Sequence, residues 1–180
     1  MSFFGWEATW GKALTLDQLQ KRGWSLANRC YFCQRHEESI DHIPLHYAKA
    51  RTLWALLCSL FGVQWVLPAT VKATLLGWDR SFVGQKRKGV WRASPLCLFW
   101  TVWKPRNKVA FEEEELSIQR LKNSFIYFLW SETKLFIKDG PSTLVDFIDW
   151  VGTRWGRGSG CSSVLGIQLG SGGCFLLCNL

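Results

Sequence analysis

All three histidines of this 180-residue chain lie in one short segment, beside a pair of cysteines. The cysteines are Cys30 and Cys33, and the histidines are His36, His42 and His46. Zinc takes cysteine sulfur and histidine nitrogen in tetrahedral sets of four, and a Cys-x2-Cys turn presents two thiolates at a suitable spacing. The segment therefore predicts a metal site. His36 could be a spare ligand, but we expect a solvated loop histidine.

A cysteine beside a histidine can also act as a thiol nucleophile with its base. The Cys-x2-Cys spacing favours a metal over this alternative. The chain also lacks a paired-aspartate polymerase box, a glycine-rich phosphate loop and a His-Glu-x-x-His motif. We therefore expect no enzyme, no catalytic residue and no small-molecule substrate.

Hydrophobic residues make up 48% of the sequence, and twelve residues are tryptophan. Such a composition argues against global disorder and predicts a tryptophan-rich core. Some of these rings could instead stack on nucleobases. Seven cysteines follow a start that lacks the basic and apolar stretches of a secretory leader. We expect a reducing, intracellular location, nuclear or cytoplasmic. The longest apolar run, residues 93–103, is about half of a membrane span, so no membrane partner is expected.

Positive charge is concentrated in one part of the chain. Residues 80–108 carry eight basic side chains and no acidic one, which equals the net charge of +8 for the whole sequence. Such a local field attracts polyanions and gives salt-sensitive binding to phosphates. Lys86, Arg87, Lys88, Arg92, Lys104, Arg106 and Lys108 are the predicted nucleic-acid contacts, with Trp91 and Trp103 as lesser stacking candidates. The alternative is a solvated loop and helix face.

The spacing of apolar residues predicts a mainly α-helical domain over residues 1–155. Thr15 and Gln18 have the form of a capping box, and Pro44 suits the first turn of a helix. Residues 156–180 hold seven glycines and four serines without periodicity, which predicts a disordered tail. Five of the expected helices cover residues 2–11, 15–22, 44–61, 117–137 and 142–155. Another is expected to begin at residue 81 or 86, to bend at Pro95 and to end at residue 104.

Several sequence blocks occur in an order typical of one protein family. They are Phe3–Ala8, Leu14–Leu19, Arg22–Trp24, Asn28–Cys30 with Cys33, Glu37–His42, Leu53–Trp54, Leu60–Val63, Pro95–Cys97 and Trp103–Asn107. Over residues 3–155 the chain closely resembles the zinc-binding domain that follows reverse transcriptase in plant LINE-type retrotransposon polyproteins. The resemblance implies a small helical domain with a zinc-knuckle-like loop, and a role in helping the polymerase grip template RNA or target DNA.

The resemblance also implies a ligand set, from which this chain departs. The family uses a Cys-x2-Cys pair, a histidine and a cysteine five residues beyond it, and those positions are Cys30, Cys33, His42 and Tyr47 here. We expect His46 to replace the missing thiolate, which completes a Zn²⁺ site of Cys30, Cys33, His42 and His46.

Members of this family begin further upstream, so Met1 falls inside the domain and a truncated fragment is expected. The predicted function is a zinc-binding module that binds RNA or single-stranded DNA. The alternative is a helical protein-interaction or structural remnant with no retained activity.

Overall fold

The computed structural model describes residues 2–79, 87–109, 117–134, 137 and 140–152. Within these ranges the chain is helical and forms no strand, so the predicted mainly α fold is confirmed. The Gly/Ser-rich segment 156–180 and the predicted boundary at residue 155 lie outside the described residues. The elements are α1 (Ser2–Thr9), α2 (Leu16–Lys21), the π-helical turn η1 (His42–His46), α3 (Ala48–Phe61), α4 (Val71–Asp79), α5 (Lys88–Val109), α6 (Ile118–Thr133) and α7 (Leu144–Gly152).

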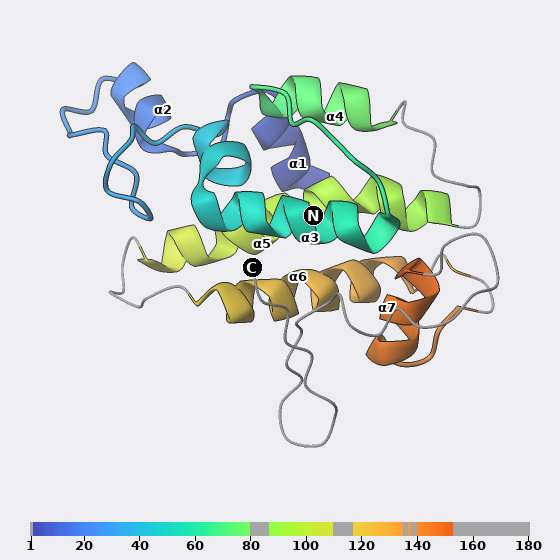
Figure 1. The fold of residues 1–180 in the computed structure, drawn as a ribbon. Coiled ribbons are helices and arrows are strands. Elements are labelled where there is room, and N and C mark those ends of the chain that lie inside the picture. The colour runs from blue at the N-terminus through green and yellow to red at the C-terminus, as the bar shows by residue number, and fades with distance from the viewer. Residues whose placement is uncertain (1, 80–86, 110–116, 135–136, 138–139, 153–180) are drawn as a thin grey trace.

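Helix α5 is the longest described helix and lies at the centre of the packing. It contacts α1, α3, α4, α6 and η1, while α7 packs against α3 and α6. Figure 1 shows α3, α5 and α6 crossing the molecule, with α1 and α4 above them and α7 beside α6. Among the described helices, none is both long and apolar enough to cross a membrane.

Three tryptophans form the centre of the core. Trp54, Trp78 and Trp91 are each 2% exposed. The rings of Trp78 and Trp91 stack with centroids 3.8 Å apart, and Trp54 meets Trp78 edge-on. A tryptophan-rich core is therefore confirmed for these residues. Because Trp91 and Trp103 are buried, the prediction that they stack on nucleobases is wrong.

Helix α5 continues through Pro95, where the sequence predicted a bend. Proline has no N–H, so the carbonyl of Trp91, four residues earlier, loses its helical partner. The indole Nε1 of Trp78 donates to that carbonyl at 2.7 Å, and Trp91 Nε1 donates to the Trp78 carbonyl at 3.2 Å. A side chain from α4 thus satisfies the group that the proline leaves free. The helix extends to Val109, beyond the predicted end at Lys104.

Two predicted helix starts differ from the structure. Thr15 is the N-cap of α2, but its hydroxyl bonds to the Asp17 carboxylate instead of a backbone N–H, so the predicted capping box is wrong. Pro44 lies in η1, a turn that closes when the Tyr47 N–H donates to the His42 carbonyl at 2.8 Å. The following helix, α3, therefore begins four residues later than predicted, at Ala48.

Helix α4 was missed by the sequence analysis. Its buried positions Val71, Thr74 and Trp78 follow helical spacing, but the helix is short. Its first N–H is satisfied from elsewhere in the chain, because the Asp41 carboxylate accepts from Val71 N at 2.7 Å. A contact over that sequence distance is invisible to local pattern analysis. The predicted helices 117–137 and 142–155 are present as α6 and α7. Residues 135, 136 and 153–155 of the predicted ranges lie outside the described residues.

A buried ion pair joins the cysteine segment to α5. Glu38 is fully buried and Arg106 is 8% exposed, and the two side chains form an ion pair with two hydrogen bonds. The carboxylate also accepts from the backbone N–H of Leu16 at 3.1 Å. The Arg106 guanidinium lies over the rings of Tyr31 and Trp103, at 5.2 and 5.1 Å. Glu38 therefore connects the start of α2, the cysteine segment and α5.

Replacing Arg106 with Met should destabilise the protein strongly, because it leaves a buried carboxylate without a counter-charge. We expect a loss of about 3–5 kcal/mol in the free energy of unfolding. Arg92→Met is the matched control on the same helix, since Arg92 pairs with Asp79 at an exposed position. That change should cost less than about 1 kcal/mol. Urea denaturation followed by circular dichroism measures both, and equal losses would contradict the structural role of Glu38.

Candidate metal centre

Three of the four predicted ligands converge at one point. The Sγ atoms of Cys30 and Cys33 and a ring nitrogen of His42 all lie within 4.8 Å of one another. Cys33 Sγ lies 3.4 Å from His42 Nε2. Cys30 is fully buried, Cys33 is half-buried and His42 is 9% exposed. The loop and η1 thus bring two thiols and an imidazole together at the edge of the core.

The donor set and its spacing fit a metal ion that accepts sulfur and nitrogen. Zn²⁺ binds sulfur at ~2.3 Å and nitrogen at ~2.0–2.1 Å, so a tetrahedral ion sets these atoms about 3.5–3.6 Å apart. The 3.4 Å between Cys33 Sγ and His42 Nε2 is close to that separation. The three residues can therefore hold a metal ion without a large rearrangement.

The backbone of the cysteine loop fixes the positions of the thiols. The Gln34 N–H donates to the Cys30 carbonyl at 2.9 Å, and the Cys30 N–H donates to the His36 carbonyl at 2.8 Å. Gln34 adopts a left-handed conformation, with φ of 53°, which turns the chain back on itself. The segment from Cys30 to His36 is therefore a closed loop.

The two thiols have different acidities in the metal-free protein. Burial raises the pKa of Cys30 to about 11. Burial also opposes ionisation of Cys33, but hydrogen bonds from the Arg35 backbone N–H and the His36 ring lower the pKa of Cys33 to about 7. Burial lowers the pKa of His42, and the charges of His36 and His46 add to this effect. At neutral pH the loop therefore offers one readily ionised thiol and one neutral imidazole.

His46 does not join the three converging residues, so its prediction as the fourth ligand is not supported. Its side chain is exposed, and Nε2 donates to the Ala69 carbonyl at 3.0 Å. That bond directs the ring toward the segment before α4. The spacing of four residues between His42 and His46 gave no indication of this contact with Ala69.

Tyr47 fills the position at which the resemblance places a fourth cysteine. Its ring is 6% exposed and stacks on Phe32 of the cysteine loop, with centroids 4.8 Å apart. Burial and the nearby thiols of Cys30 and Cys33 raise the pKa of the phenol to about 12. Tyr47 thus holds the loop against η1 by packing.

The predicted nucleic-acid contacts are distributed around α5. Arg87 donates to the Val151 carbonyl at 2.6 Å, and Arg92 pairs with Asp79 at 2.9 Å. Lys88, Lys104 and Lys108 are exposed, and the Lys104 ammonium lies 5.8 Å from the centre of the Phe128 ring. Lys86 lies outside the described residues. At 100° per residue, Lys88 lies about 160° around the helix from Lys104, so the exposed lysines do not form one face.

Arg106 was predicted to contact phosphate, and the structure contradicts this. The side chain is buried, and its guanidinium is paired with Glu38. An arginine committed to a buried carboxylate is not available to a phosphate without unfolding its surroundings. The sequence could not reveal this role, because its partner is distant in the chain.

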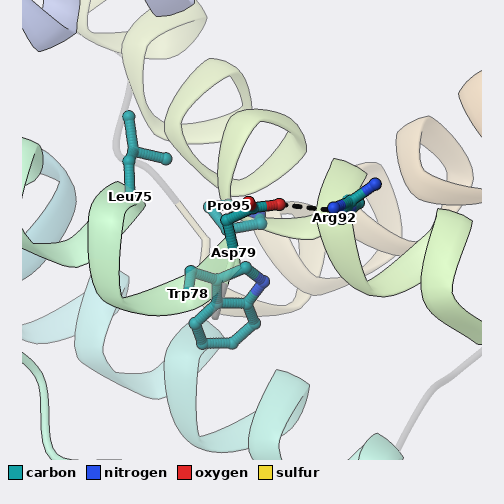
Figure 2. A pocket seen from close by; sticks show the side chains of 5 residues that line it. All are labelled: Leu75, Trp78, Asp79, Arg92 and Pro95. Carbon is teal, nitrogen blue, oxygen red and sulfur yellow. Dashed lines mark ion pairs between the residues drawn. The ribbon is translucent and has the colours of Figure 1, made fainter. Parts of the chain in front are cut away.

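A separate pocket lies between α4 and α5, and it offers no catalytic group beyond one ion pair. Figure 2 shows its lining of Leu75, Trp78, Asp79, Arg92 and Pro95, with the Asp79–Arg92 pair across it. Its volume is about 340 Å³. The acid and the base are already bonded to each other, and the other lining side chains are apolar.

The comparisons with known proteins agree with the metal centre in one respect. Residues 1–54 match the family model described as zinc-binding in reverse transcriptase, and this range contains all three converging ligands. No curated protein matches the chain. No solved structure matches it either. The chain therefore contains a region similar to the zinc-binding domain of reverse transcriptases.

In the metal-free protein, Cys33 should react with iodoacetamide faster than Cys58 at pH 7. Both thiols are half-buried, but burial raises the pKa of Cys58, whereas the pKa of Cys33 is lowered to about 7. Thiolates are the reactive form, so the more acidic thiol is alkylated first. Mass spectrometry of tryptic peptides measures the two rates. Added zinc should protect Cys33 and leave Cys58 unchanged, and equal rates with or without zinc would contradict the assignment.

Proposed function

We propose that this chain is a fragment of a LINE-type plant retrotransposon polyprotein. In this proposal it is a non-catalytic zinc-binding module that binds nucleic acid. The observation that carries the proposal is the convergence of Cys30, Cys33 and His42 within the region similar to reverse transcriptase zinc-binding domains. Two thiolates in a tight loop with a histidine from the next element are typical of structural zinc sites.

The position of the ligands favours a structural role for the ion. Cys30 and Cys33 lie in the loop before Glu38, and His42 begins η1, which leads directly into α3. An ion bound to all three would fix the loop against η1 and keep Glu38 beside Arg106. The binding free energy of the metal would therefore add to the folding free energy of the domain.

Purified protein should contain about one zinc ion per chain, and Cys33→Ser or His42→Ala should abolish this content. Both changes remove a converging ligand. Cys58→Ser is the matched control, because this thiol is half-buried in α3 and is not among the converging residues. Elemental analysis after dialysis measures the stoichiometry. Acidification should release the ion, because protons compete for the thiolates and imidazole. Absence of stoichiometric zinc from the parent protein at neutral pH would overturn the proposal.

Two sets of exposed basic side chains support nucleic-acid binding. The first consists of the exposed lysines of α5, of which Lys104 and Lys108 lie about 40° apart around the helix and Lys88 lies on another face. The second lies in and before the cysteine loop in the sequence and consists of Arg22, Arg29 and Arg35. Trp10 and Trp24 lie in the same N-terminal region and are 59% and 65% exposed. Basic groups neutralise phosphates, and exposed indole rings stack on unpaired bases, which together suit single-stranded nucleic acid.

Two triple variants test this part of the proposal with equal changes in charge. The first variant removes the lysine set through Lys88→Ala, Lys104→Ala and Lys108→Ala. The second removes the arginine set through Arg22→Gln, Arg29→Gln and Arg35→Gln. Each lost phosphate contact should reduce the magnitude of the slope of log K against log salt by roughly 0.7 for single strands. Loss of three contacts should therefore change the slope by about 2, and loss of the two on one face of α5 by about 1.4. Fluorescence anisotropy with a labelled oligonucleotide, at several salt concentrations, measures both affinity and slope.

The larger effect identifies the interface, and zinc content verifies that each variant keeps its metal centre. Binding should weaken uniformly across sequences, because phosphate contacts carry little sequence information. A parent protein that shows no salt-dependent binding would contradict nucleic-acid recognition. It would favour instead a structural remnant that retains only the helical fold.

A further inference from the structure

Three converging residues leave one position of a tetrahedral site to be filled. A further nitrogen donor beside these residues is Nδ1 of His36, which lies 3.6 Å from Cys33 Sγ. This matches the separation of about 3.5–3.6 Å that tetrahedral zinc imposes on a sulfur and a nitrogen ligand. We propose that His36 is the fourth ligand, that it binds through Nδ1, and that the site is Cys30, Cys33, His36 and His42. The inference rests on the proposed zinc-binding function.

The closed loop brings His36 to the ligands. The Cys30 N–H bonds to the His36 carbonyl at 2.8 Å, so the backbones of these two residues are adjacent. The Cys33 sulfur is close to both imidazoles, at 3.6 Å from His36 Nδ1 and 3.4 Å from His42 Nε2. The ring centroids of His36 and His42 are 5.3 Å apart. Both rings therefore approach the same thiol, as two nitrogen ligands of one ion do.

Completing the site requires movement of an exposed side chain only. His36 is not among the three residues whose donor atoms all lie within 4.8 Å of one another. Its side chain is exposed, so rotation about its side-chain bonds does not disturb the packed core. By contrast, moving His46 into the site would break its bond to the Ala69 carbonyl and require movement around η1.

Two of the nearby carboxylates, those of Glu38 and Asp41, are already used by the fold. Glu38 is fully buried and accepts bonds from Arg106 and from the Leu16 backbone. Asp41 accepts from the Val71 backbone N–H at 2.7 Å. Removing either from its partners would leave buried or helix-terminal groups unsatisfied. Unlike Glu38 and Asp41, His36 can thus join the site without leaving a buried or helix-terminal group unsatisfied.

The proposed set has two chemical consequences. Two thiolates balance the charge of Zn²⁺, and two neutral imidazoles complete a Cys₂His₂ site. The spacing is Cys30-x2-Cys33-x2-His36-x5-His42, so the whole site is contained in residues 30–42. The loss of a cysteine at position 47 then does not open the coordination sphere.

His36→Ala should weaken zinc binding, and His46→Ala is the matched control because His46 is also an exposed histidine in the same segment. Loss of an outer-shell partner typically lowers metal affinity by roughly 10- to 100-fold. Because His36 is proposed to bind the ion directly, we expect His36→Ala to lower zinc affinity by at least that much. His46→Ala should leave the affinity within about twofold of the parent. Competition with a chromophoric chelator measures the zinc Kd of the full chain. Cobalt(II) substitution tests the geometry, because the visible bands of tetrahedral cobalt should change in His36→Ala alone.

Long-range ¹H–¹⁵N spectra of the zinc-loaded parent test which nitrogen binds. His36 should show a metal-bound Nδ1, and His42 a metal-bound Nε2. Unchanged zinc affinity and cobalt spectrum in His36→Ala, with the parent still binding zinc, would overturn this inference while leaving the proposed function intact. Weakening in His46→Ala instead would restore His46 as the fourth ligand. A parent protein that binds no zinc would overturn both.

Discussion

The buried pair of Glu38 and Arg106 is the interaction on which the N-terminal half of the structure depends. Glu38 stands between the cysteine loop and His42, and its oxygens serve α2 and α5 at once. Such a pair is weak evidence for high stability, because the cost of removing two charges from water offsets much of their attraction. Its effect is positional. The Glu38 carboxylate has its counter-charge only beside Arg106, so the cysteine loop docks on α5 in a single way. This docking sets where the thiols of Cys30 and Cys33 lie.

Local patterns predicted most of the helices whose apolar face packs on the core, and they predicted the metal loop. The apolar spacing in α6 and the Cys-x2-Cys pair are properties of adjacent residues, which sequence analysis can read. The errors have a different origin. Helix α4 was missed, and the Val71 N–H at its start is satisfied by Asp41 from a distant part of the chain. Arg106 was read as a surface charge, although its partner lies far away in the chain. Both depend on contacts that form only when the elements pack.

The metal centre shows the same division between local and distant information. Cys30, Cys33 and His42 were predicted from spacing and converge in the structure. His46 was predicted on the same basis, but its ring bonds to the Ala69 carbonyl. Spacing along the chain identifies residues that can reach a common point, whereas competing partners decide which of them do. The conformation of Gln34 reverses the loop and brings His36 back toward the thiols, and this turn carries no proline or glycine that would have marked it.

The exchange of hydrogen bonds between Trp78 and Trp91 has a consequence for how the domain assembles. The carbonyl that Pro95 leaves free is buried in the core and receives its donor from α4, a separate helix. Until α4 docks, the middle of α5 has an unsatisfied polar group at the place where it must enter an apolar environment. The complete central helix and the docked α4 are therefore favourable only together. This makes α4 and α5 one cooperative unit, in which neither is expected to open without the other.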